Sequence, residues 1–147
     1  MAINFSRPGS QVVAQYFNLV RLGIDGHRRI HQASQDVALW LSGQLQETGA
    51  FELITRGDDL PVFAFRCSGA SSDFNPFDLS ERYRDRGWQV PAYPFPDNRS
   101  DVVALRIVCR EGFNHDLAES FMTDTRRHLD HFAGRRPSAA EATAFHH

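Results

Sequence analysis

The first third of the chain carries apolar residues at helical spacing. They recur three and four positions apart over residues 10–20, which predicts an amphipathic helix. The spacing resumes after Gly23, and Asp25 is expected to cap a second helix that ends at Gly49. The interval 23–26 fits either a kink or a complete break between the two helices.

Short stretches rich in β-branched and aromatic residues then predict four strands. Residues 51–55 and 61–67 flank a turn of charged residues and glycine, so they are expected to form a hairpin. A short strand is expected over 88–90, and the prolines of 91–96 predict irregular backbone after it. The strongest strand signal covers 102–108, which is apolar on both faces except at one arginine.

Two asparagines stand where they can cap further helices. Asn75 precedes a helical pattern that reaches Gly87, and Asn114 precedes one that Gly134 ends. Residues 135–147 have little to bury and predict a mobile tail. The order helix, helix, strand, strand, helix, strand, strand, helix predicts an α/β sandwich, in which helices cover one face of a mainly antiparallel sheet.

Composition and charge narrow the functional classes. A chain of 147 residues with 41% hydrophobic and 23% charged residues is ordinary for one soluble domain with a core. The 18 acidic residues offset the 16 basic ones, so nucleic acid and membrane surfaces are not expected partners. Cys67 and Cys109 lie in strand-like runs and are expected to be buried free thiols. No signal peptide or membrane span is recognisable, and the cytoplasm is the expected location.

Four stretches of the chain form a specific signature because they occur together in a fixed order. They are FSRPGSQVVAQY at 5–16, LG at 22–23, DLSER at 78–82 with RGWQVPA at 86–92, and VVALRIVCR at 102–110 with GF at 112–113. Over residues 3–132 they resemble the C-terminal portion of pyridoxal-phosphate-dependent glutamate decarboxylases of the bacterial and plant type. The resemblance implies the small-domain fold of fold-type I pyridoxal-phosphate enzymes.

The resemblance also implies a division of the chain. Residues 1–22 match the end of a large-domain segment with its N-terminal helix, 23–132 the small domain, and 133–147 a flexible tail. Family enzymes are about three times as long, and their large domain, which holds the cofactor, corresponds to sequence upstream of Met1. A truncated gene product, a gene fragment and an excised piece of a longer protein are the alternatives for this difference.

The chain contains 16 arginines and no lysine. Pyridoxal phosphate is held in such enzymes through a Schiff base to a lysine amine. The isolated chain is therefore expected to hold no covalent cofactor and to be inactive. The sequence alone does not decide whether it is classed as an enzyme.

Arg106 is the first candidate site residue, because it is the one charged side chain in the apolar run of 102–108. A buried guanidinium needs a carboxylate partner, which it binds bidentately. The resemblance implies that Arg106 binds the α-carboxylate of glutamate. The alternative is a structural salt bridge to an acid such as Asp101 or Glu81.

Other candidates rest on the resemblance alone. Ser6 is expected to reach the cofactor phosphate of a neighbouring subunit, with a plain turn or capping serine as the alternative. His146 and His147 resemble a family ending that regulates the active site with pH, with a tag remnant or a tail without function as the alternative. His27 and His31 are four apart on a predicted helix, but no third ligand is evident and no metal is expected.

The resemblance implies an enzyme that converts L-glutamate to 4-aminobutanoate and CO2, to which this chain contributes a substrate-binding arginine. The alternative is a non-catalytic oligomerisation or interaction module derived from a decarboxylase, with a second copy or a large domain as its partner. Trp88 and the prolines of 91–94 predict a rigid loop. This loop is expected to have a role in the core, and the alternative is that it shapes the substrate mouth.

Overall fold

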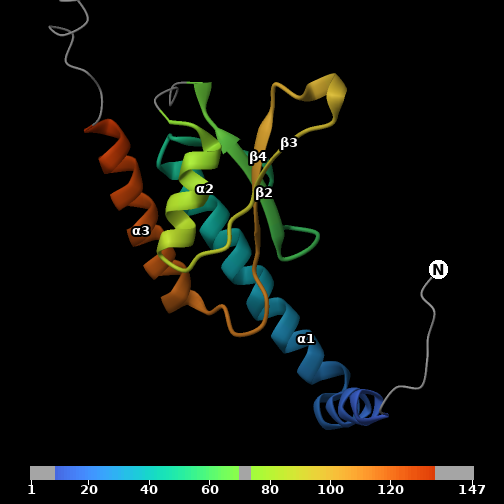
Figure 1. Ribbon diagram of the computed structural model, residues 1–147. Helices are drawn as coiled ribbons and strands as arrows, with labels where there is room; N and C mark the ends of the chain where they lie inside the picture. Colours follow the sequence, from blue (N-terminus) through green and yellow to red (C-terminus); the bar gives the residue numbers. More distant parts are fainter. Residues whose placement is uncertain (1–8, 70–73, 135–147) are drawn as a thin grey trace, which may run out of the picture.

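The computed structural model describes residues 9–69 and 74–134, which form one four-stranded sheet and the helices beside it (Figure 1). In chain order the elements are α1 (Ser10–Glu47), β1 (Phe51–Thr55), β2 (Val62–Cys67), α2 (Pro76–Asp85), β3 (Ala92–Pro94), the 3-10 helix η2 (Asp97–Arg99), β4 (Val103–Val108) and α3 (His115–Ala133). The predicted order of helices and strands is thus confirmed, with the first two helices joined through a bend.

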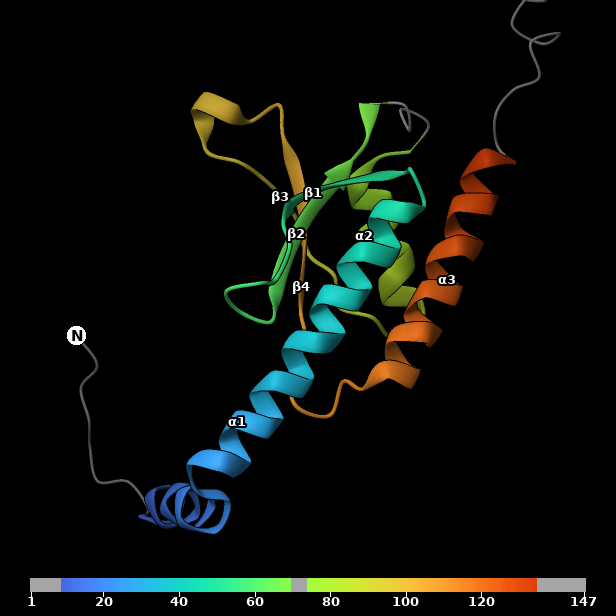
Figure 2. The same cartoon turned by 180° about the vertical axis from the view of Figure 1, so that it is seen from behind.

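The sheet is antiparallel throughout and has the strand order β1-β2-β4-β3. Helix α1 contacts β1 and β2, α2 contacts β3 and β4, and α3 packs against α1 and α2. The two opposite views show these helices on one face of the sheet, as predicted (Figures 1 and 2). The other face is not covered by any helix in the described ranges.

The core lies between the sheet and the helices. Phe63, Phe65 and Leu105 point inward from the central strands, and Leu41 and Leu45 meet them from α1, all with no exposed surface. In β2 and in the second half of β4, burial therefore alternates along the strand, because the described helices cover only one face of the sheet. None of the helices in the described part of the chain combines the length and apolar character needed to cross a membrane.

Helix α1 bends at Gly23, where φ is 58° and ψ is −173°. Residues with a side chain rarely adopt this conformation, so glycine allows the bend. The segment before the bend runs away from the body of the molecule (Figures 1 and 2). The connection is therefore a kink, and Asp25 lies inside the helix, paired with Arg28 at 2.8 Å, so the prediction that it caps a separate helix is wrong.

The segment before β4 also differs from the prediction. Residues 88–90 form no strand, and β3 lies instead over Ala92–Pro94, inside the proline-rich stretch. Among the described residues this strand is at the edge of the sheet and pairs only with β4, where Tyr93 stands opposite Ala104. An edge strand tolerates proline because one side of its backbone needs no hydrogen-bond partner in the sheet.

Candidate functional site

Arg106 lies on the face of the sheet that the described helices leave uncovered. Its neighbours in β4, Leu105 and Ile107, are buried against the helices, so Arg106 points to the opposite face and is exposed. Val108 shares that face and is 55% exposed. The expectation of a buried guanidinium is therefore wrong. Val102 and Ala104 are buried on this side of the run, but the side is open to solvent at Arg106 and Val108.

Arg106 lines a hollow of about 460 Å³ beside the end of β4. The lining residues are Gly87, Gln89, Pro91, Arg106, Val108 and Arg110. They provide two guanidinium groups and one side-chain amide, and no carboxylate is among them. Such a lining attracts an anion, and arginine matches the planar geometry of a carboxylate.

Two contacts hold Arg106 in place. Its backbone N–H donates a hydrogen bond to the Pro91 carbonyl oxygen at 3.3 Å, and its Cζ lies 5.8 Å from the centroid of the Tyr93 ring, within cation–π range. The alternative partners Asp101 and Glu81 form no ion pair with it in the described structure, and Asp101 pairs with a neighbouring arginine at 3.5 Å. The guanidinium can therefore accept a carboxylate from outside the described residues.

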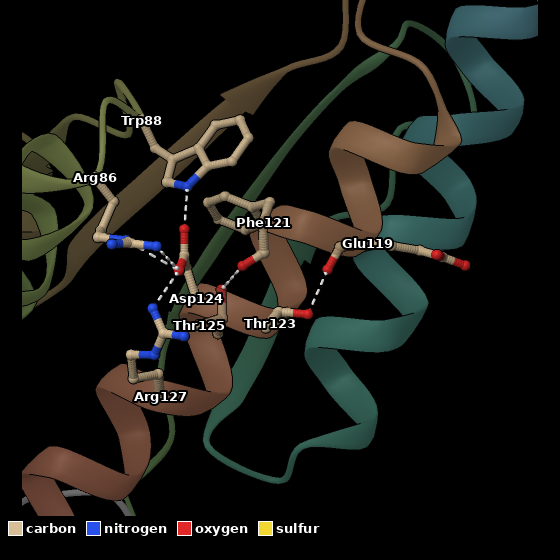
Figure 3. Close-up of polar contacts among 8 residues, drawn as sticks. All are labelled: Arg86, Trp88, Glu119, Phe121, Thr123, Asp124, Thr125 and Arg127. Atoms are coloured by element: carbon tan, nitrogen blue, oxygen red, sulfur yellow. Dashed lines mark hydrogen bonds and ion pairs between the residues drawn. The ribbon is translucent and has the colours of Figure 1, made fainter.

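A polar cluster around Asp124 connects α3 to the segment before β3 (Figure 3). The indole N–H of Trp88 donates to Asp124 Oδ2 at 2.9 Å, and the Nε–H of Arg86 donates to Oδ1 at 3.1 Å. Arg127 Nη1 lies 3.2 Å from the same Oδ1. Burial opposes ionisation of Asp124, but the hydrogen bonds from Trp88 and Arg86 and the charges of Arg86 and Arg127 outweigh it and lower the pKa of the carboxyl. Asp124 is therefore ionised at neutral pH.

Sequence reasoning identified Arg106 but missed Arg110, Gln89 and Asp124. Arg110 follows Arg106 by four positions and lies two residues beyond the end of β4, where the alternation of buried and exposed residues continues, and this signal could have identified it. Asp124 gives no comparable signal, because its partners Trp88 and Arg86 lie 36 and 38 residues away in the sequence.

Ser6, His146 and His147 lie outside the described residues. Of the other candidates, His27 and His31 are described and do not line this hollow. His27 and His31 stack along α1 with ring centroids 6.4 Å apart, and the described residues contain no group of three potential metal ligands.

The two cysteines are not reactive groups. Cys109 is buried and Cys67 is half-buried, and both are free thiols. Burial raises the pKa of each thiol to about 11, so both are protonated at neutral pH. Their expected role as inert thiols agrees with these surroundings, although Cys67 is less buried than predicted.

The chain matches part of longer proteins in sequence, although no protein-family model matches it. A glutamate decarboxylase from Aliivibrio fischeri is 46% identical over 134 residues, which is 90% of this chain and 29% of that protein. A probable glutamate decarboxylase gamma from Listeria monocytogenes is 39% identical over 125 residues, which is 84% and 27% of the two chains. The chain thus spans less than a third of the length of these relatives.

Solved structures show the same relationship. A glutamate decarboxylase from Lactobacillus brevis superposes with a TM-score of 0.82 at 41% identity, over 89% of this chain and 30% of that one. A sphingosine-1-phosphate lyase from Burkholderia pseudomallei shares the fold at 21% identity, with a TM-score of 0.68 over 98% and 29% of the two chains. In sequence and in fold, this chain matches the C-terminal portion of glutamate decarboxylases.

Proposed function

We propose that this chain is the C-terminal part of a pyridoxal-phosphate-dependent glutamate decarboxylase, which converts L-glutamate to 4-aminobutanoate and CO2. Arg106 binds the α-carboxylate of the substrate. The observation that carries the proposal is an exposed arginine in a hollow whose lining holds no carboxylate, in a chain whose relatives are named glutamate decarboxylases.

An arginine suits this role because its planar group makes two parallel hydrogen bonds to a carboxylate, which fixes direction as well as position. The α-carboxylate is the group that leaves as CO2, so fixing it also fixes the bond that breaks. Arg106 is carried by β4, which is paired with a strand on each side, and the Tyr93 ring lies within cation–π range of its guanidinium.

The residues of this chain do not fit the covalent site of the cofactor. The sequence has no lysine to form a Schiff base, and the hollow offers two guanidinium groups and an amide, which fit a carboxylate. The proposal therefore assigns the lysine to polypeptide other than this chain. It keeps Ser6 as a contact to the cofactor phosphate of a neighbouring subunit, and His146 and His147 as regulatory residues.

The same proposal divides the chain by its resemblance to the family. Residues 1–22 complete the large domain and carry the N-terminal helix, 23–132 form the small domain, and 133–147 form the tail. The cytoplasm is the proposed location of the enzyme. On its own the chain is inactive, because catalysis requires the lysine that it lacks.

The first segment of α1 supports a partner for this domain. Six of the large apolar side chains before the bend are 54–70% exposed, and they are Val12, Val13, Tyr16, Phe17, Leu19 and Val20. An apolar surface of this kind marks a contact with other polypeptide. The proposed partner is the large domain of a decarboxylase or a second copy. The same surface favours the second candidate function, a non-catalytic interaction module, and sedimentation with and without a full-length relative separates the two.

A chimera tests the catalytic proposal. The matching segment of the Aliivibrio fischeri glutamate decarboxylase is replaced by this chain, and glutamate decarboxylation is measured. We expect activity in the chimera and a loss of kcat/KM by about 30- to 1,000-fold in the Arg106→Gln chimera, because losing one member of a charged pair costs about 2–4 kcal/mol. Arg106→Lys should recover only part of the loss, since lysine lacks the bidentate geometry.

The matched control is Arg99→Gln, which removes an exposed arginine paired with Asp101. It should leave kcat/KM unchanged. Cofactor absorbance of each chimera shows that it is folded and loaded. An Arg106→Gln chimera that binds cofactor and retains full kcat/KM contradicts the proposal.

A further inference from the structure

Residues 86–91 form one wall of the Arg106 hollow although they belong to no helix or strand. Every second residue of the wall lines the hollow, namely Gly87, Gln89 and Pro91. The two residues between them face the core, where Trp88 is half-buried and Val90 is 5% exposed. Lining and inward-facing residues thus alternate along the wall, although Gly87 turns the chain there with a φ of 86°. The position of the wall therefore depends on what holds its inward side chains.

Backbone and side-chain contacts hold different parts of the wall. The backbone N–H of Trp88 donates to the Tyr83 carbonyl oxygen at 2.9 Å, and the Ser80 hydroxyl donates to the Val90 carbonyl oxygen at 2.6 Å. The Trp88 indole packs edge-on against Phe113 and Phe121, and Asp124 accepts its N–H at 2.9 Å. Asp124 thus provides the polar contact of the large side chain that stands between two lining residues.

Asp124 also holds the start of the wall. Its Oδ1 lies 3.0 Å from Arg86 Nη2 and 3.2 Å from Arg127 Nη1, so two cations share one carboxylate (Figure 3). The Asp124 side chain is only 10% exposed, which strengthens these contacts relative to a surface ion pair. Without the negative charge, the two guanidinium groups repel each other and the Trp88 N–H loses a strong acceptor.

We propose that Asp124 is a positioning residue for the anion hollow, which it shapes by holding Arg86 and Trp88 and thereby setting the wall relative to Arg106. A displaced wall also reaches Arg106 directly, because the Pro91 carbonyl oxygen accepts its backbone N–H. The role of the hollow in binding substrate rests on the proposed function, whereas the mechanical connection from α3 to the hollow does not.

The connection is tested in the 147-residue chain by nuclear magnetic resonance of Asp124→Asn, which keeps the shape of the side chain and removes its charge. The readout is the backbone amide signals of three residues of the hollow, Gly87, Gln89 and Arg106. We expect these signals to shift together with the Trp88 indole signal. The control is Glu52→Gln, which breaks the ion pair with Arg66 on the β1–β2 hairpin and should leave all four signals in place.

A second variant keeps the test decisive if Asp124→Asn fails to fold. Trp88→Phe retains an aromatic ring against Phe121 and removes only the donor to Asp124. It should shift the same three amide signals, and the double variant should show less than the sum of the single effects, because both act through one contact. Amide signals of the hollow that stay in place in a folded variant of either kind overturn the proposal.

Kinetics in the full-length chimera separate this inference from the proposed function. We expect Asp124→Asn to raise KM for glutamate by about tenfold with a smaller change in kcat, since a displaced wall moves the carboxylate site. If Arg106→Gln has no kinetic effect, the proposed function fails while the signal shifts still report on the connection. If Arg106→Gln reduces kcat/KM and Asp124→Asn changes neither KM nor the signals, Asp124 has no positioning role.

Discussion

His128 on α3 is a buried imidazole whose Nε2 has no hydrogen-bond partner among the described residues. Burial is the main cause that lowers its pKa, and the Arg82 charge is the next. The charged groups that face it are Arg82, Arg86, Arg127 and Asp124, of which only the last raises the pKa. His128 is therefore neutral in the folded state at neutral pH.

This arrangement makes stability depend on pH. In the unfolded chain His128 takes up a proton near pH 6.5, whereas the folded chain resists this, so the free energy of unfolding falls as pH drops below about 6.5. We expect His128→Phe, which keeps a ring against Tyr83, to reduce this dependence. Urea unfolding at pH 7.5, 6.5 and 5.5 measures it. If the free energy of unfolding falls equally with pH in the two proteins, His128 is not the source of the dependence.

At the scale of single residues, strand alternation carried more information than hydrophobicity. Arg106 was identified because it interrupts an apolar run, yet its exposure follows from its neighbours Leu105 and Ile107, which already occupy the packed face. Asp124 could not be predicted, since an acid on a helix surface becomes significant only when the fold brings Trp88 to it.

The kink of α1 is a property of a single glycine. An ideal Cβ at Gly23 meets no atom within 4 Å, so only the backbone conformation, with φ at +58°, opposes a side chain there. A residue other than glycine at this φ and ψ costs about 1–3 kcal/mol. Because the segment before the kink buries few of its apolar side chains, it can change direction at little cost.

We therefore expect Gly23→Ala to straighten α1 rather than to unfold the domain. Spin labels on Gln15→Cys and Gln46→Cys, both on exposed positions, measure the distance between the two segments. In a continuous helix these positions lie about 46 Å apart, from a rise of 1.5 Å per residue. An unchanged distance, compared with the glycine protein, would show that packing and not Gly23 sets the bend.

At the scale of elements, periodicity and caps predicted most of the fold. Asn75 and Asn114 accept hydrogen bonds from the first turns of α2 and α3, as their positions in the sequence indicated. Besides the Asp25 cap, β3 is an exception, because proline signals irregular backbone unless the strand lies at a sheet edge. Edge position depends on the pairing with β4, which a local sequence pattern does not contain.

The whole molecule packs its own core, but two regions of its surface have no partner in the described structure. The fully buried residues of the sheet and helices indicate a unit that packs its own interior. The exposed apolar segment of α1 and the open, arginine-lined hollow have no counterpart in the described structure. Both features are explained if other polypeptide packs against this domain, and the chain spans less than a third of the length of the relatives it matches.

The absence of lysine gives the most general prediction, because it depends on covalent chemistry and not on a contact. The α-amino group is the only primary amine in the sequence, so pyridoxal phosphate can form a Schiff base only there. After borohydride reduction, mass spectrometry of the purified chain should find the cofactor on the N-terminal peptide alone, and glutamate with added cofactor should yield no 4-aminobutanoate above a protein-free control. The chimera, which regains a lysine, is the positive control. Turnover by the 147-residue chain itself would mean that catalysis here does not use the covalent chemistry of the family.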